Sequence, residues 1–293
     1  MGTPGMDLPE ALRLFAQAGL DGAEVIWGED FPASMQEGAG GREAAELGKL
    51  AGDLGLEVAC LTPYMTGLNS LDAAERRRDL DRFGRCIEDA GVLGCPNIRV
   101  YAGSFMPGEE GVREEKWELL IGSLRVLAKD AEEAGVTLCV ENHFNTMTVT
   151  AAETAELVKA VGSEAVGALY DQANLTFTHA EPHEEAIRVQ SPFIRHVHVK
   201  DLVFVDPDKA FAASSVENVS QEDRAVRSRV VGDGVLDWTD ILRRLREVGY
   251  DGYLSLEYEY RWHPDDLPDP AEGFARSARA LRDILYAIGV AER

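Results

Sequence analysis

The chain alternates between two hydrophobic patterns, one with a helical period and one that is a short, continuous apolar run. Each unit consists of an amphipathic helix, a turn that contains glycine, and a strand rich in valine, leucine or isoleucine. Helices that alternate with continuously apolar strands predict a parallel sheet and the α/β class. Seven strands are predicted, and they end at Trp27, Thr62, Tyr101, Asn142, Asp171, Asp201 and Glu257.

Two architectures of this class compete, a closed barrel and an open doubly wound sheet. An open nucleotide-binding sheet carries a glycine-rich turn directly after an early strand. The only glycine cluster, G-A-G-G at residues 38–41, follows a polar loop instead. Polar and ionisable residues end several different strands, which is typical of a (β/α)8 TIM barrel. We therefore predict a single TIM-barrel domain over residues 1–293.

The start and the last third of the chain depart from a regular barrel pattern. The first predicted helix, about Leu8 to Ala18, is preceded by Met1–Met6, which is too short for a strand and a loop. We expect either a start upstream of Met1 or a missing or abbreviated first strand, so that Trp27 ends the second strand of the barrel. The polar segment 206–227 predicts an insertion loop that folds over the strand ends.

The composition and the net charge exclude some classes of function. The 293 residues include 45% hydrophobic residues, enough for a large core, and their net charge is −23. This charge repels phosphate backbones and no basic face offsets it, so we expect no nucleic-acid partner. No apolar run reaches the roughly 18 residues of a membrane span and no signal segment is visible, so we expect a cytoplasmic protein. The four cysteines lack C-x-x-C spacing and are expected to be reduced core thiols.

Two consecutive strands end in acids. In V-T-L-C-V-E-N-H, the period of two of a strand places Glu141 and His143 on the same side. Asp171 ends the next apolar run, A-V-G-A-L-Y-D. An acid at the end of a buried strand is costly unless it is paired, so both acids are candidates for a functional site.

Two later strands alternate ionisable and apolar residues. In H-V-H-V-K-D, His196 and His198 face the same way, and in L-S-L-E-Y-E, Glu257 and Glu259 do so. The two histidines compete for one ligand position. We favour His198 because it lies nearer the carboxyl end of its strand, and we expect His196 to be a hydrogen-bonded residue lower in the barrel.

Three carboxylates and one imidazole that converge at neighbouring strand ends predict a metal site. Without a cation, their mutual repulsion and burial would cost several kcal/mol. A donor set of mostly oxygen with one nitrogen suits Mn²⁺ or Mg²⁺, with Co²⁺ and Zn²⁺ as alternatives. We therefore expect a divalent metal, with Mn²⁺ favoured.

The order of these motifs resembles the xylose isomerase-like TIM-barrel superfamily, in its single-metal branch. The resemblance is carried by D-G-A-E-V, V-E-N-H, Y-D-Q-A-N, H-V-H-V-K-D, G-D-G-V-L-D-W and L-S-L-E, and it extends from about Asp7 to Ile288. The superfamily includes ketose 3-epimerases, hydroxypyruvate isomerases, inosose dehydratases and the endonuclease IV branch. The three-metal site of that last branch needs early histidines, and none precedes His143.

The resemblance assigns roles to particular residues. It implies metal ligands at Glu141, Asp171, His198 and Glu257, with the two glutamates also acting as the acid/base pair. The candidates for substrate binding are Asn174, Lys200 and Arg229. Asn174 stands where the epimerases usually carry a histidine, and Arg229 lies just before the G-D-G string.

Taken together, these features predict a metal-dependent isomerase or epimerase that acts by enediolate proton transfer on a small unphosphorylated sugar or hydroxy-ketone. Asp233 within the glycine loop disfavours a phosphorylated substrate. The alternative is a lyase, either a dehydratase of an inosose or a cleaver of 3-keto-glycosides, with His143 as an additional acid or base. A second alternative is a non-catalytic sugar-binding or partner subunit. The expected partner is a sugar or polyol-derived small molecule, and a homo-oligomer is left open.

Overall fold

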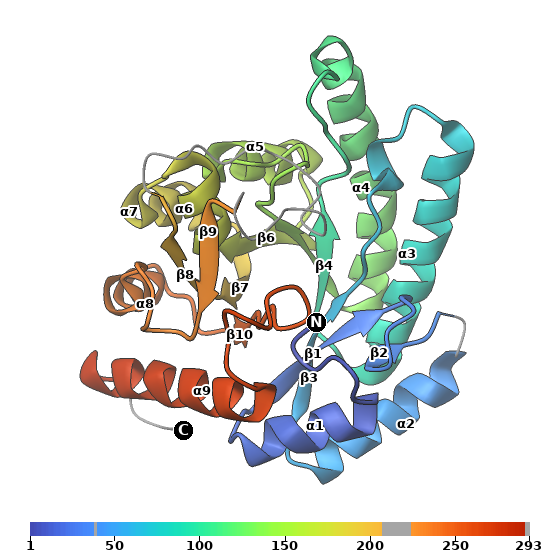
Figure 1. The fold of residues 1–293 in the computed structure, drawn as a ribbon. Helices are drawn as coiled ribbons and strands as arrows, with labels where there is room; N and C mark the ends of the chain where they lie inside the picture. The colour runs from blue at the N-terminus through green and yellow to red at the C-terminus, as the bar shows by residue number, and fades with distance from the viewer. Residues whose placement is uncertain (38–39, 207–223, 291–293) are drawn as a thin grey trace.

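The structure is a computed structural model that describes residues 1–37, 40–206 and 224–290. Its centre is an eight-stranded parallel sheet with the order β10-β7-β6-β5-β4-β3-β1-β2, which curls into a barrel with helices on its outer side (Figure 1). The strands are β1 (Gly22–Trp27), β2 (Ser34–Met35), β3 (Glu57–Thr62), β4 (Asn97–Tyr101), β5 (Thr137–Glu141), β6 (Val166–Asp171), β7 (Ile194–Val199) and β10 (Leu254–Leu256).

The helices connect successive strands, as the sequence pattern predicts. Gly94 and Gly135 adopt left-handed conformations after α3 and α4, so each helix ends and a strand begins within three residues. The helices are α1 (Leu8–Gln17), α2 (Gly40–Asp53), α3 (Ala73–Leu93), α4 (Arg113–Ala134), α5 (Ala151–Val161), α6 (Gln172–His179), α7 (His183–Gln190), α8 (Trp238–Glu247) and α9 (Pro270–Ala287), with 3₁₀ turns at Gly67–Asn69 and Glu110–Val112.

The predicted fold class is confirmed. Each of the seven predicted strands is present and ends within two residues of its expected position. Residues 1–6 contain no strand, and the eighth strand of the sheet, β2, has only two residues and follows β1. No strand therefore precedes β1 within residues 1–21, as the sequence pattern predicts, and Trp27 ends the first full strand of the sheet.

The sheet is open between its first and last long strands. No backbone ladder joins β10 to β1 within the described residues, but side chains cross the gap. Ser255 Oγ donates to Glu24 Oε2 at 2.5 Å, and the rings of Phe15 in α1 and Phe274 in α9 have centroids 4.9 Å apart. A cavity of about 1240 Å³ lies beside this gap.

An antiparallel hairpin, which the sequence analysis missed, projects beyond β7. It consists of β8 (Asp201–Phe204) and β9 (Val226–Arg229), with Asp201 opposite Arg229. Residues 226 and 227 therefore belong to a strand and not to the predicted insertion loop. The polar character of the segment predicted a loop, but a polar strand requires only a pairing partner. The rest of the predicted loop, residues 207–223, lies outside the described residues.

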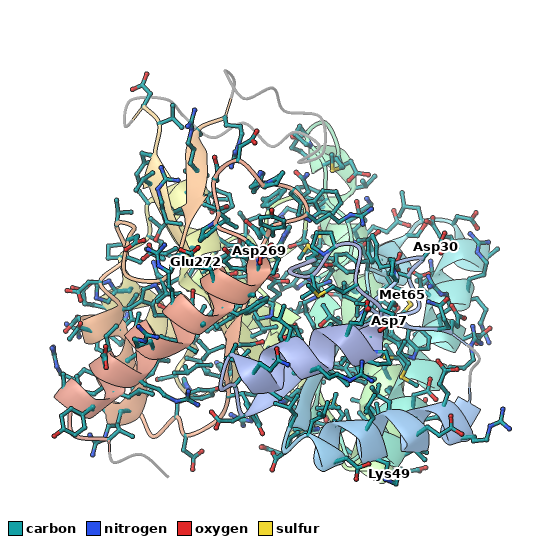
Figure 2. All side chains as sticks on the ribbon, turned by 60° about the horizontal axis from the view of Figure 1, so that its bottom comes forward. Asp7, Asp30, Lys49, Met65, Asp269 and Glu272 are labelled. Atoms are coloured by element: carbon teal, nitrogen blue, oxygen red, sulfur yellow. The ribbon has the colours of Figure 1, made fainter. Side chains whose placement is uncertain are left out.

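Polar and apolar side chains separate as the composition predicts. Charged side chains such as Lys49 on α2 and Glu272 on α9 project outward, and Asp7 and Asp269 cap α1 and α9 (Figure 2). The four cysteines form no disulfide and are buried, as expected for core thiols. Within the described part of the chain, no helix is long and apolar enough to cross a membrane.

Candidate metal centre

The structure brings the four predicted ligand residues together at one end of the barrel. His198 Nδ1 lies 3.5 Å from Glu141 Oε1, 4.0 Å from Asp171 Oδ2 and 3.4 Å from Glu257 Oε2. One ligand atom from each of the four residues lies within 4.8 Å of the others. Three of the four side chains are almost completely inaccessible to solvent, and Glu257 is 11% exposed.

Strand register explains why these four side chains meet. Asp171 at the end of β6 pairs with His198 in β7, and His198 pairs with Ser255 in β10. Glu141 ends β5, the next strand along, and Glu257 directly follows β10. The valines that alternate with the histidines of β7 are buried, so the strand period directs the imidazoles into the barrel.

The donor set fits a divalent cation. His198 Nδ1 is buried and makes no hydrogen bond in the described structure, although it faces the three carboxylates. Unsatisfied buried polar atoms are rare because each costs about 1–3 kcal/mol. A cation between the three carboxylates and Nδ1 would satisfy this atom. Oxygen donors with one imidazole are a set that Mn²⁺, Mg²⁺ or Zn²⁺ accepts.

Lys200 lies inside the same cluster. Its Nζ is 2.9 Å from Asp171 Oδ2, 2.6 Å from Glu257 Oε2 and 3.8 Å from Glu259 Oε1. Burial opposes the charge, but Asp171 and Glu257 raise the pKa of Lys200 well above its ordinary value. Burial also raises the pKa of Asp171 to about 7, against the pull of Lys200. The predicted substrate-binding lysine therefore supplies a positive charge beside the candidate ligands.

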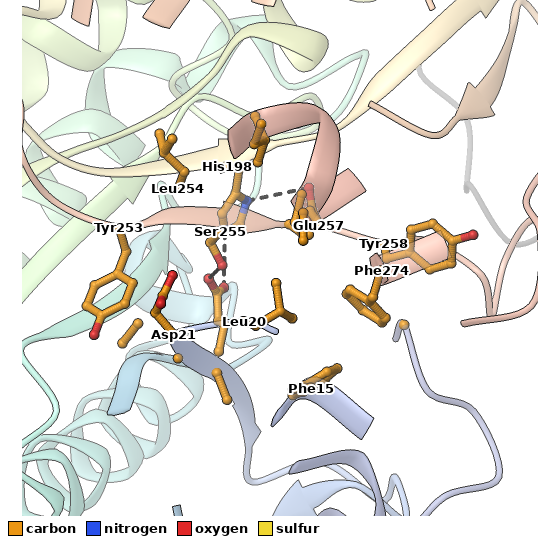
Figure 3. A pocket seen from close by; sticks show the side chains of 18 of the residues that line it. Phe15, Leu20, Asp21, His198, Tyr253, Leu254, Ser255, Glu257, Tyr258 and Phe274 are labelled. Carbon is orange, nitrogen blue, oxygen red and sulfur yellow. Dashed lines mark hydrogen bonds and ion pairs between the residues drawn. The ribbon is translucent and has the colours of Figure 1, made fainter. Parts of the chain in front are cut away.

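Glu24 is a half-buried acid of the site that the sequence analysis did not single out. It lies in the middle of β1 and accepts hydrogen bonds from His196 Nε2 and His198 Nε2, each at 3.0 Å. Thr62 Oγ1 and Ser255 Oγ also donate to it, at 2.7 and 2.5 Å. His198, Ser255 and Glu257 converge from neighbouring elements here (Figure 3). His196 is thus hydrogen-bonded below the cluster, as predicted.

Arg99 is a second buried residue that sequence reasoning missed. It is 1% exposed, its Nη1 lies 3.5 Å from Glu141 Oε2, and its Nη2 donates to the Pro63 carbonyl at 3.0 Å. Its guanidinium lies 4.4 and 4.2 Å from the ring centroids of Tyr64 and Tyr101. The sequence contains one sign that Arg99 and Glu24 belong to the site, because each is the single charged residue of an otherwise apolar strand.

His143 lies just beyond β5. Its Nδ1 is 2.7 Å from the Phe144 carbonyl oxygen, which can only accept, so Nδ1 carries the hydrogen and Nε2 keeps its lone pair. The imidazole stacks on Phe144 with centroids 4.2 Å apart. Burial lowers the pKa of His143, and the charge of Glu141 opposes this shift. The ring is therefore a neutral group near the cluster, and no hydrogen bond or ion pair among the described residues joins it to the four ligands.

The two remaining substrate-binding candidates differ in position. Asn174 Nδ2 donates to Glu141 Oε1 at 3.3 Å and to the Asn142 carbonyl at 3.1 Å, so its amide lies against the cluster. Arg229 Nη1 donates to the neighbouring Ser228 carbonyl at 2.8 Å. In the part of the chain that the structure describes, Arg229 makes no hydrogen bond or ion pair with the four ligands.

Two further groups of histidines and acids are satisfied without a cation. Glu24 with His196 and His198 forms the hydrogen-bonded group described above, in which all acceptor oxygens have donors. His183 with Asp240 is an ion pair near the surface, supported by Arg244 Nε at 2.5 Å from Asp240 Oδ2. The cluster around His198 Nδ1 is therefore the best candidate metal centre among the described residues.

Comparisons with known proteins agree with this fold. The sequence matches the family described as "Xylose isomerase-like TIM barrel" over residues 12–284. Inosose dehydratase of Geobacillus thermodenitrificans (strain NG80-2) is 32% identical over 146 residues, which cover 50% of this chain and 48% of that protein. The match thus spans about half the length of that relative.

Two solved structures share the fold at low sequence identity. L-ribulose 3-epimerase is 21% identical with a TM-score of 0.74, and the match covers 98% of this chain and 92% of that one. The IOLI protein, described "with a binding zinc atom", is 18% identical with a TM-score of 0.75, and the match covers 96% and 94% of the two chains. The likeness shows that the chain shares the overall fold of these two proteins over nearly its whole length.

Proposed function

Because the chain belongs to the xylose isomerase-like TIM barrel family, we propose that it is a divalent-metal-dependent enzyme that acts on a small unphosphorylated keto-sugar or related hydroxy-ketone. The observation that carries the proposal is the buried cluster of three carboxylates around the unpaired Nδ1 of His198. Its chemistry would be removal of the proton next to a carbonyl group, the step common to sugar isomerases, epimerases and dehydratases.

Glu141, Asp171, His198 and Glu257 would hold the metal ion, with Mn²⁺ favoured by the oxygen-rich donor set. When bound, such an ion supplies an electrophile that acidifies the carbon between a carbonyl and a hydroxyl group. Asn174 and Lys200 lie against the ligands and would orient the substrate oxygens. Lys200 can also stabilise negative charge that develops on those oxygens, because it stays protonated at neutral pH.

Glu141 and Glu257 are the proposed acid/base pair. They come from β5 and β10, which are separated in the sheet by β6 and β7, so they approach the cluster from different sides. Burial opposes ionisation, but His198 lowers the pKa of Glu141, and Lys200 and His198 hold the pKa of Glu257 well below its ordinary range. Both are therefore carboxylates at neutral pH and able to accept a proton. Proton return to the opposite face gives an epimer, and return to the adjacent carbon gives an isomer.

A lyase is the second candidate, and His143 is the observation that favours it. Its neutral imidazole, with Nε2 unprotonated, offers one acid/base group beyond the two glutamates. Such a group suits expulsion of a hydroxyl or an aglycone after the proton is removed. The relative named as an inosose dehydratase supports the same reading.

The test is a substrate panel in deuterated water. Ketoses, inososes and 3-keto-glycosides are incubated with the protein and Mn²⁺, and deuterium uptake and product formation are followed by NMR. We expect exchange at the carbon next to the carbonyl for at least one class. Binding of a sugar without exchange or product in any class would contradict the enzyme proposal and favour the non-catalytic sugar-binding alternative.

His143→Ala separates the two candidates on whichever substrate is turned over. If the enzyme is a lyase, exchange should continue on the glutamates while elimination falls by about 10²-fold or more. His183→Ala, at a histidine paired with Asp240 away from the cluster, is the matched control. Near-wild-type exchange and turnover in His143→Ala would remove this residue from the mechanism and leave the isomerase or epimerase reading.

A further inference from the structure

Glu24 lies directly beneath the candidate ligand His198, on the opposite side of the imidazole from the other carboxylates. We propose that Glu24 is a positioning residue that fixes the orientation of His198, so that Nδ1 and its lone pair face the metal cluster. This inference rests on the proposed metal-dependent function and adds to it a residue that touches neither metal nor substrate.

Hydrogen bonding determines which ring nitrogen of His198 faces Glu24 and which faces the metal cluster. Glu24 Oε1 accepts from His198 Nε2 at 3.0 Å and from Thr62 Oγ1 at 2.7 Å. A carboxylate can only accept when ionised, so Nε2 of His198 must carry the hydrogen. The ring nitrogen left for a cation is then Nδ1, which has no hydrogen-bond partner. A carboxylate behind a metal-bound histidine also increases the basicity of the ligand.

The second oxygen of Glu24 keeps the carboxylate itself in place. Oε2 accepts from His196 Nε2 at 3.0 Å and from Ser255 Oγ at 2.5 Å. The four donors come from β3, β7 and β10, so Glu24 on β1 is fixed from three other strands. Each of its two oxygens therefore accepts two hydrogen bonds, and the side chain is fixed with every acceptor site used.

A purely structural role is the competing explanation. Glu24 also bridges the open side of the barrel, because Ser255 belongs to β10 and no backbone ladder joins β10 to β1 in the described chain. Ser255→Ala removes that bridge and leaves the bond to His198. Glu24→Gln keeps the size of the side chain but removes the carboxylate charge behind His198, whichever way the amide is turned. The two variants therefore separate the two roles.

The experiment measures Zn²⁺ affinity of the metal-free full chain by chelator competition. We expect Glu24→Gln to weaken Zn²⁺ binding by about 10–100-fold, while Ser255→Ala keeps the wild-type affinity. Unchanged affinity in folded Glu24→Gln would overturn the proposal. Equal weakening in both variants would also overturn it, because closure of the barrel would then explain the effect.

A second measurement needs no variant of Glu24. In ¹⁵N-histidine-labelled wild-type protein loaded with Zn²⁺, NMR should show the His198 proton on Nε2, with the signal assigned from its absence in His198→Asn. A proton on Nδ1 would overturn the proposal. The metal proposal fails separately, if wild-type protein takes up no Zn²⁺ or Mn²⁺. In that case, the Nε2 proton of His198 in the metal-free protein should still show the downfield shift of a hydrogen bond to a carboxylate, and an Nε2 proton without that shift would overturn the proposal.

Discussion

At the scale of single residues, the site balances buried charges of opposite sign. Asp171 and Glu257 share the ammonium group of Lys200, and Glu141 lies against Arg99. A carboxylate in a barrel interior loses the solvation of water, so each cation lowers the cost of burial. Lys200 can thus hold the carboxylates together when no metal is bound, and its contribution to stability should depend on the metal.

Lys200→Met tests this dependence. In metal-free protein the substitution leaves Asp171 and Glu257 without their cation, and breaking a buried pair of this kind costs about 3–5 kcal/mol. In protein saturated with Mn²⁺ we expect a smaller loss, because the metal replaces the missing positive charge. Urea unfolding with EDTA and with Mn²⁺ measures both values. Equal losses under the two conditions would show that Lys200 and the metal do not act on the same carboxylates.

Glu257→Gln tests the double role of the glutamates. The substitution removes a ligand charge and an acid/base group, so we expect turnover to fall by at least about 10²-fold and metal retention to weaken. Glu259→Gln is the matched control, because Glu259 is 3.8 Å from Lys200 and accepts from Ser228 Oγ at 3.2 Å. Full activity and metal content in Glu257→Gln, measured by turnover and by elemental analysis, would contradict the site assignment.

Sequence analysis identified more of the site residues at the ends of strands than of those in the middle of strands. Glu141, Asp171, His198 and Glu257 each close or follow an apolar run, and the period of two determines their direction. Glu24 was missed because one acid inside G-A-E-V-I-W resembles an edge-strand charge. Its four donors come from distant parts of the chain, and only the assembled barrel brings them together.

At the scale of elements, Asp201 connects the hairpin to the loop that follows it. Its Oδ2 accepts from the backbone N–H of Gly232 and Gly234 at 2.9 and 3.2 Å, and its Oδ1 accepts from Leu202 and Leu236 at 2.9 and 3.3 Å. A Cβ atom on Gly234 would lie 2.0 Å from Asp201 Oδ1, so the loop needs glycine there. The K-D and G-D-G strings are therefore parts of one structural unit.

Asp201→Ala should destabilise the protein through these unsatisfied N–H groups. Each of the four hydrogen bonds contributes about 0.5–1.5 kcal/mol to stability, so we expect a total loss of at least about 2 kcal/mol by urea unfolding. Asp233→Ala, at an exposed residue paired with Arg276 at 2.6 Å, should cost at most about 1 kcal/mol. Similar small losses in both variants would show that Asp201 does not hold the loop.

The parallel strands were predictable and the hairpin was not. An apolar run such as V-T-L-C-V predicts a strand by itself, without information about the neighbouring strands. β9 has the sequence V-R-S-R, and its strand conformation depends on pairing with β8 across a segment outside the described residues. Tertiary pairing, and not local propensity, determines such a strand.

At the scale of the whole molecule, one cluster connects four strands of the barrel. Glu141 and Asp171 end β5 and β6, His198 lies in β7, and Glu257 follows β10. A metal bound by these residues would therefore cross-link four neighbouring strands, in addition to the backbone ladders between them. We expect metal binding to stabilise the fold as well as the site.

Removal of metal tests this link. A ligand at 100 times its Kd stabilises the folded state by about 2.7 kcal/mol, which corresponds to several degrees in Tm for a chain of this size. We expect EDTA to lower Tm and added Mn²⁺ to restore it, measured by scanning calorimetry. A Tm that is the same with EDTA and with excess Mn²⁺ would contradict a metal site in the folded protein.

The most direct measurement is the anomalous scattering of a crystal of this protein soaked in Mn²⁺. The account predicts one strong peak in the anomalous difference map, bounded by Glu141, Asp171, Glu257 and the Nδ1 atom of His198. A map with no peak at that position, or with its peak on the Nε2 side of His198 beside Glu24, would contradict it.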